Sequence, residues 1–224
     1  MLAALTSAAL AFTVQTVPGS DEPVQWGRMP QSYQYADDHR LPAGSAQAVD
    51  LAFDAWSHVD GSEAGFEAEA ALDPLPVASF DDQQVVFLAS DWPYGSDALA
   101  IASMWSDEAS GQLLHFDIRL NPTVDWAVDG DEDCFDLESA VTHEVGHVLG
   151  LEHTDVDEAA MFAVLGPGHL RRGLHEDDEE GLRFLYPDTG DDGAQPLSCS
   201  SVPGSFGWLL VGFALATGRR GGRP

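Results

Sequence analysis

The stretch that decides the fold is residues 136–153, which read DLESAVTHEVGHVLGLEH. Asp136 is a residue type that caps helix N-termini, and apolar residues follow it at helical spacing. Gly150 tolerates the positive φ angle that is common just after a helix ends. The stretch therefore predicts a helix that begins at Asp136 and ends near Gly150.

Three histidines in this stretch have the spacing of metal ligands. His143 and His147 stand one turn apart on the same side of the predicted helix, and the glycine turn lets the chain fold back to present His153. Three neutral imidazoles suit one Zn²⁺ ion and leave a fourth position for water, which is the layout of a catalytic site. Glu144 follows the first histidine, where a carboxylate can act as a general base.

The pattern His143-Glu144-x-x-His147-x-x-Gly150-x-x-His153 resembles the signature of the metzincin zinc proteases. The neighbouring residues resemble the matrixin branch, in a bacterial form. Met161, within residues 158–162 (EAAMF), is similar to the matrixin Met-turn, whose methionine forms the floor under the metal. Residues 172–186 (RGLHEDDEEGLRFLY) resemble the closing helix of that domain.

The resemblance implies an α+β fold of the metzincin type. It has a twisted, mostly parallel five-stranded sheet with an antiparallel edge strand, two long helices that include the zinc-binding helix, and a small C-terminal subdomain with the Met-turn and a closing helix. The pattern along the chain agrees, with a helix expected over 43–58 and strands over 66–71, 84–89, 98–105 and 113–120, and a further strand near 32–35. By resemblance, 98–105 is the edge strand above the cleft, where it can bind an extended peptide by strand addition.

The implied function is that of a zinc-dependent endopeptidase with one catalytic Zn²⁺ held by His143, His147 and His153. Glu144 would act as the general base on a metal-activated water, the substrate would be a protein or peptide, and the chain is expected to be a monomer. Two alternatives stay open. One is a surface-anchored acidic protein that binds calcium or a partner through an inactive peptidase-like domain, and the other is a zinc amidase that acts on cell-wall peptides.

Two features of the vertebrate enzymes are missing from this sequence. No Pro-Arg-Cys-Gly segment precedes the domain, so the sequence gives no support for latency through a prodomain thiolate. His115 lies in a segment (HFD) similar to one that carries a structural-zinc histidine, but the segment upstream, residues 91–97, is too short for the expected partner ligands. His115 is therefore interpreted as an ordinary strand residue, and no structural zinc is expected.

An acidic loop lies directly before the motif helix. Residues 129–136 (DGDEDCFD) carry five carboxylates, which fit either a Ca²⁺ site or a solvated turn. Cys134 lies in this loop and is either packed, paired with Cys199 in a disulfide, or a ligand that holds the enzyme latent. The sequence leaves these alternatives open.

Charge and length exclude two classes of protein. The 224 residues include 38 acidic and 9 basic side chains, a formal net charge of −29, and this field repels phosphate backbones. A nucleic-acid partner is therefore not expected. No stretch reaches the roughly 20 apolar residues of a membrane-spanning helix, which excludes a multi-span membrane protein.

The two ends of the chain resemble targeting signals and not parts of the catalytic domain. Residues 1–20 resemble a secretory signal, with Ala9-Leu10-Ala11 as a candidate cleavage site. The catalytic domain is expected over 24–187, followed by an acidic linker over 188–198. Residues 199–224 resemble the C-terminal sorting tags of myxobacterial surface proteins, in which the cysteine, here Cys199, is the point of processing and lipid attachment and the segment beyond it is removed. These features predict a secreted or cell-surface protein, with membrane anchoring through Cys199.

Overall fold

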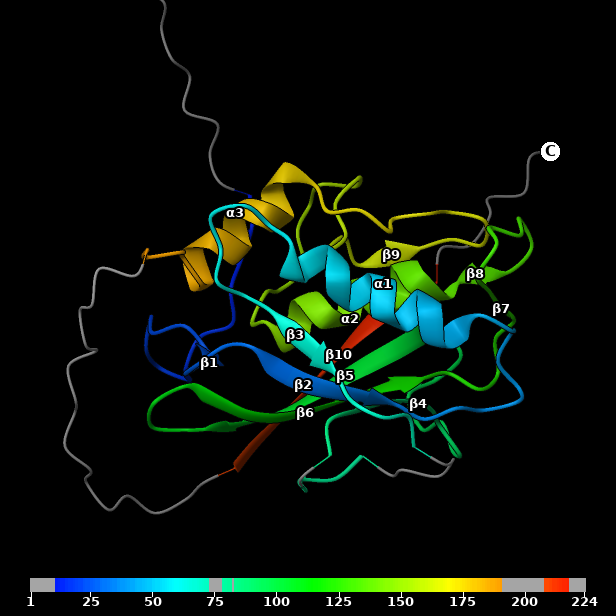
Figure 1. Ribbon diagram of the computed structural model, residues 1–224, viewed down its shortest axis with the longest axis horizontal. Coiled ribbons are helices and arrows are strands. Elements are labelled where there is room, and N and C mark those ends of the chain that lie inside the picture. The colour runs from blue at the N-terminus through cyan, green and yellow to red at the C-terminus, as the bar shows by residue number, and fades with distance from the viewer. Residues whose placement is uncertain (1–10, 73–77, 82, 191–207, 218–224) are drawn as a thin grey trace, which may run out of the picture.

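The computed structural model describes residues 11–72, 78–81, 83–190 and 208–217 (Figure 1). The described helices are α1 (Ser45–Ser57), α2 (Leu137–Val148) and α3 (Glu176–Leu185). The strands are β1 (Gln25–Trp26), β2 (Gln31–Tyr35), β3 (Phe66–Ala68), β4 (Val85–Leu88), β5 (Ala98–Asp107), β6 (Gln112–Leu120), β7 (Trp126–Ala127), β8 (Phe135–Asp136), β9 (Val164–Leu165) and β10 (Trp208–Thr217). All the expected helices and strands therefore occur, with shifted ends.

One mixed sheet forms the centre of the molecule. Its order is β3-β2-β4-β6-β5-β10-β9, and β1 pairs in parallel with the start of β6. Strands β2, β3, β4 and β6 run parallel, while β5 runs antiparallel to β6. The mostly parallel sheet is confirmed, but the expected number of five strands is wrong, because β1, β9 and β10 extend the sheet to eight.

The position of β5 also differs from the expectation. The resemblance placed 98–105 at the edge of the sheet, but β10 pairs antiparallel with β5 on the side away from β6. Figure 1 shows β10, in red, running beside β5. In the described chain β5 is therefore an inner strand.

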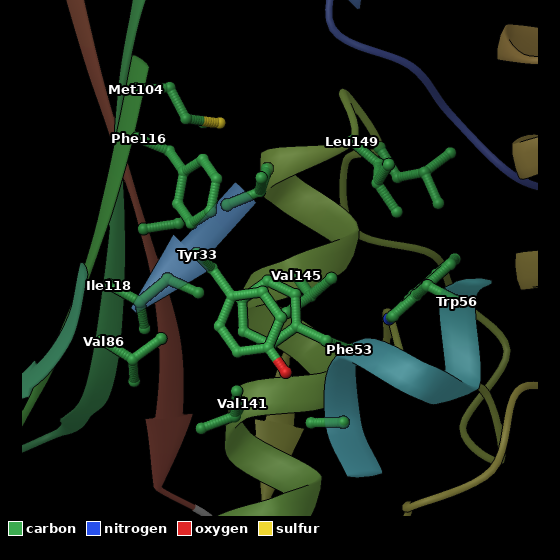
Figure 2. Packing of buried hydrophobic residues seen from close by; sticks show 14 of the residues in the cluster. Tyr33, Phe53, Trp56, Val86, Met104, Phe116, Ile118, Val141, Val145 and Leu149 are labelled. Carbon is green, nitrogen blue, oxygen red and sulfur yellow. The ribbon is translucent and has the colours of Figure 1, made fainter. Parts of the chain in front are cut away.

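The core lies between the sheet and the helices α1 and α2. Figure 2 shows side chains from all three meeting there, such as Phe116 from the sheet, Phe53 from α1 and Val145 from α2. Phe53 stacks on the Tyr33 ring at a centroid distance of 3.8 Å. Trp56 is fully buried, and its indole N–H donates to the carbonyl oxygen of Thr142 in α2 at 2.8 Å. This packing fixes α2 against both layers and so fixes the side chains that α2 carries.

The segment before β1 packs onto the end of α2. Val14 bridges Leu151, and the backbone N–H of Gln15 donates to the Gly150 carbonyl oxygen at 2.8 Å. The Gln15 side chain also donates to the carbonyl oxygen of His147 at 3.1 Å. The folded unit thus includes residues before the expected domain start at residue 24. A leader cut after Ala11 would leave these contacts intact, whereas one cut after residue 20 would remove them.

Several predicted features fall outside the described residues. These are residues 1–10 of the expected signal, residues 191–198 of the linker, and residues 199–207 and 218–224 of the expected tag, which include Cys199. Within the described ranges, no helix combines the length and the apolar character that crossing a membrane requires. The apolar run of the expected tag is present there as β10.

Candidate metal centre

Helix α2 carries the first two candidate ligands. The carboxylate of Asp136 caps the helix by accepting the backbone N–H of Ser139 at 2.9 Å, as the sequence predicted. His143 and His147 follow one turn apart and are both buried. Their Nε2 atoms lie 3.1 Å from each other, with the rings at 87°.

A tight turn brings the third imidazole to the same point. Gly150 has a φ angle of 98°, and a Cβ atom there would lie 2.3 Å from the carbonyl oxygen of Val24, so the position requires glycine. After this turn the Nε2 atom of His153 lies 3.2 Å from the Nε2 atoms of both His143 and His147. A local glycine turn and the period of one helix thus suffice to assemble the cluster.

The spacing of the three nitrogen atoms fits a zinc ion. Tetrahedral zinc with Zn–N bonds of about 2.0–2.1 Å separates neighbouring ligand nitrogens by roughly 3.3–3.4 Å. The observed separations of 3.1–3.2 Å lie close to this value. Among the described residues, His143, His147 and His153 are the one group of three that could hold a metal ion.

The imidazoles are oriented and kept neutral by their surroundings. The Nδ1 atom of His143 lies 2.7 Å from the carbonyl oxygen of Ala160, and that of His147 lies 2.8 Å from the carbonyl oxygen of Leu151. A carbonyl can only accept, so each Nδ1 carries the proton and each Nε2 presents its lone pair. Burial lowers the pKa of His143 to about 3, and it also lowers the pKa values of His147 and His153. Neutral imidazole is the form that binds a metal.

Glu144 joins α2 to the sheet. Its side chain is fully buried, and Oε2 accepts the backbone N–H of Ala102 in β5 at 2.6 Å. This charge-assisted hydrogen bond fixes the carboxylate beside the strand that the resemblance assigns to the cleft.

The loop that contains Ala160 and Met161 packs against α2 and supports the histidine cluster. The sequence pattern predicted only part of this support. Met161 is buried against α2, and a Cβ atom on Gly146 would lie 2.1 Å from its sulfur atom. The carboxylate of Asp178 accepts the backbone N–H groups of Ala160 and Met161 at 2.8 and 3.1 Å. Since the Ala160 carbonyl orients His143, Asp178 acts on the cluster through this loop.

Asp178 and Gln15 are the supporting residues that the sequence analysis missed. Asp178 closes a capping box with His175 at the start of α3. The spacing of three residues between them is the signal that could have identified it. Gln15 lies in a segment interpreted as a leader, and its contacts with the turn after α2 carry no local sequence signal.

The carboxylates of the acidic loop, residues 129–136, do not form a second metal-binding group among the described residues. Asp136 is occupied by the helix cap and by Arg172, whose guanidinium donates to its two oxygens at 3.1 and 2.6 Å. Asp131 accepts the backbone N–H of Asp133 at 2.9 Å, as in an ordinary polar turn. The calcium expectation therefore finds no support in the described residues.

Two other residues singled out from the sequence, Cys134 and His115, are not members of the histidine cluster. Cys134 is a free, half-buried thiol, and its suggested partner Cys199 is outside the described residues. His115 lies buried in β6, with Nε2 3.6 Å from Oδ2 of Asp117. The Asp117 carboxylate in turn accepts the backbone N–H of Ser79 at 3.0 Å.

Comparison with known proteins agrees with this geometry. Residues 26–187 match the family model described as Matrixin. The chain is 30% identical over 175 residues to metalloendoproteinase 1-MMP of Arabidopsis thaliana, a match that covers 72% of this chain and 44% of that protein. It is 33% identical over 137 residues to 5-MMP of the same plant, covering 50% and 38%, and 36% identical over 73 residues to karilysin of Tannerella forsythia, covering 33% and 14%. The chain spans less than half the length of each of these relatives.

Proposed function

The chain belongs to the matrixin family, and from this premise we propose that it is a zinc-dependent endopeptidase. The observation that carries the proposal is the convergence of three neutral Nε2 atoms, from His143, His147 and His153, at separations that fit one tetrahedral zinc ion. With three protein ligands the fourth position remains for water or substrate, as in catalytic zinc sites.

The chain's own residues have separate tasks in this reaction. His143, His147 and His153 would hold the zinc ion, which would supply the Lewis acidity for activating water near neutral pH and for polarising the scissile carbonyl. Glu144 takes the proton from the attacking water and then delivers it to the leaving amine. The Ala102 N–H holds the Glu144 carboxylate in one orientation, so the base needs no rearrangement to act.

Met161 is assigned the role of the Met-turn methionine. It is buried and close to Gly146, between the two histidines of α2, where an apolar side chain supports the ligands from below. Asp178 anchors this loop through two backbone N–H groups, so the floor of the site is held by α3.

The remaining parts of the proposal concern substrate and location. The substrate is a protein or peptide bound in an extended form, and the chain acts as a monomer. The protein is secreted or lies at a bacterial cell surface, where Cys199 serves as the anchor. The strongly acidic composition, with a net charge of −29, supports an exported protein that works among cations and not among nucleic acids.

The test compares the zinc-loaded chain with Glu144→Gln on a denatured protein substrate. Glutamine retains an oxygen that can accept the Ala102 N–H, but it cannot take a proton, so we expect kcat to fall by about 10²–10⁴-fold. Zinc content should remain one per chain. Glu108→Ala, at an exposed acidic residue beyond the end of β5, is the matched control and should leave the rate unchanged.

Other outcomes would redirect the assignment. An undiminished rate in Glu144→Gln would remove the base role of this residue. Zinc binding without hydrolysis of any protein, but with hydrolysis of cell-wall peptides, would favour the amidase. Zinc binding with no hydrolysis of either would favour the binding-protein alternative.

A further inference from the structure

The C-terminal strand lies along the strand that the family resemblance assigns to substrate binding. β10 pairs antiparallel with β5 over nearly the whole length of both strands, from Trp208 opposite Asp107 to Ala216 opposite Ala98. Strand β6 occupies the other side of β5, so β5 has one side on which it can add an extended peptide. β10 occupies that side (Figure 1).

The opposite side of β10 is also bounded. Ala216 and Thr217 pair in parallel with Val164 and Leu165 of β9, which begins three residues after Met161. The segment therefore lies between β5 and the chain that follows the methionine loop. A peptide held on both sides in this way makes main-chain contacts with two separate walls.

The register of β10 places it opposite the β5 residue that holds the candidate catalytic group. Phe213 is the β10 residue opposite Ala102, and the Ala102 N–H is the donor to Glu144. Helix α2, which carries Glu144, also contacts β10. The regular pairing with β5 is interrupted just beyond this point, between Ala214 and Ala216.

The sequence of the segment suits such a position. Residues 208–217 read WLLVGFALAT and contain no charged residue, in a chain with 38 acidic side chains. An uncharged, apolar extended segment is costly to leave in water and gains from burial in a cleft.

We propose that segment 208–217, in the chain before any processing at Cys199, is a peptide ligand of the chain's own active-site cleft, bound where an extended substrate binds and in competition with it. This inference rests on the proposed peptidase function. A tethered ligand of this kind is present at an effective concentration of about 1 mM. If it binds with a Kd of about 0.1 mM, within the usual range of KM values, it raises the apparent KM for a second peptide about tenfold and leaves kcat unchanged.

The test cuts the tether without changing a described residue. The recognition sequence of a site-specific protease is inserted after Ser198, and the zinc-loaded full chain is measured before and after cutting at about 0.1 µM, a concentration at which the released segment dissociates by dilution. We expect the apparent KM for a fluorogenic peptide to fall about tenfold at constant kcat. The synthetic peptide WLLVGFALAT, added back at millimolar concentration, should restore the higher KM.

A second variant gives a readout that does not depend on activity. Gly212→Pro removes a backbone N–H in the middle of β10 and disfavours strand pairing, while Ala194→Pro places the same residue in the linker as the matched control. In metal-free protein, hydrogen exchange of the β5 amides should increase in Gly212→Pro and not in Ala194→Pro.

The outcomes separate this inference from the proposed function. An unchanged KM after cutting, together with unchanged β5 exchange in Gly212→Pro, would overturn the inference even if the chain hydrolyses peptides well. If β5 exchange rises but neither the cut nor the uncut chain hydrolyses any peptide, the pairing of β10 with β5 stands, the proposed function fails, and the inference of competition with substrate is overturned with it.

Discussion

Replacing Gly146 by alanine tests whether Met161 supports the histidine helix as the structure shows. Gly146 lies between His143 and His147 on α2 and faces the methionine loop. A Cβ atom there would lie 2.1 Å from the sulfur atom of Met161 and 2.9 Å from Cζ2 of Trp56. An ordinary van der Waals contact is about 3.5 Å or more, so the sulfur atom must move by on the order of 1.5 Å.

Two opposing contributions decide whether Gly146→Ala raises or lowers the free energy of unfolding. Alanine is favoured over glycine in a helix interior by about 1 kcal/mol, which would stabilise the variant. Overpacking a core costs about 1–3 kcal/mol. The upper end applies here because the new methyl group would overlap with two buried side chains, those of Met161 and Trp56. Trp56 cannot retreat freely, since its indole N–H is bonded to the Thr142 carbonyl oxygen. The net loss in the free energy of unfolding is therefore about 2 kcal/mol, which lowers Tm by roughly 4–8 °C.

The assay is urea and thermal unfolding of metal-free protein, so that zinc affinity does not enter. Gly173→Ala is the control, because a Cβ atom at Gly173 meets nothing within 4 Å, and it should change stability by less than about 0.5 kcal/mol. In the double variant Gly146→Ala/Met161→Ala the new methyl group enters space left by the methionine, and the coupling should be at least about 1 kcal/mol. A Gly146→Ala protein as stable as the parent, or more stable, would refute the packing described for this loop.

Three further predictions follow from the supporting contacts. Tyr186→Phe removes a buried hydroxyl that donates to the Leu149 carbonyl oxygen at 2.8 Å and accepts the backbone N–H of Trp26 at 3.1 Å. The free energy of unfolding measured in urea should fall by about 1–3 kcal/mol, and a fall below about 0.5 kcal/mol would argue against both hydrogen bonds. Asp178→Asn replaces a carboxylate oxygen by an amide donor and loosens the loop at Ala160, so zinc affinity measured against a competing chelator should fall about 10–100-fold, whereas unchanged affinity would exclude this support role. Removing zinc should lower Tm by roughly 5–11 °C relative to protein in free zinc at about 100 times its Kd, which contributes about 2.7 kcal/mol; a Tm that does not depend on zinc would show that the folded chain does not bind it preferentially.

The candidate ligands could be predicted from the sequence because their geometry is local. His143 and His147 are related by one helical turn, and His153 is brought to them by a single glycine turn, so a stretch of eleven residues encodes the cluster. The ranges of the central strands could be predicted from apolar runs between turn residues, whereas the number of strands and the inner position of β5 could not. Their ends shifted by a few residues, since hydrogen bonding with neighbours decides where pairing stops.

The parts that sequence reasoning missed are contacts between distant segments. The run 208–217 has an apolar pattern that fits an anchor as well as a strand, and only its pairing with β5, about a hundred residues away, decides between them. Gln15 shows the same limitation, because its contacts with the carbonyl oxygens of His147 and Gly150 join segments that lie far apart in the sequence.

Zinc K-edge X-ray absorption on the zinc-loaded full chain identifies the atoms that bind the metal and so tests whether the three histidines form the zinc site. We expect one zinc ion per chain with nitrogen and oxygen neighbours at about 2.0–2.1 Å, of which three are imidazoles, and loss of one imidazole in His153→Ala. A sulfur neighbour at about 2.3 Å would show that a thiol such as Cys134 holds the metal, and fewer than three imidazoles would mean that the cluster of His143, His147 and His153 is not the zinc site.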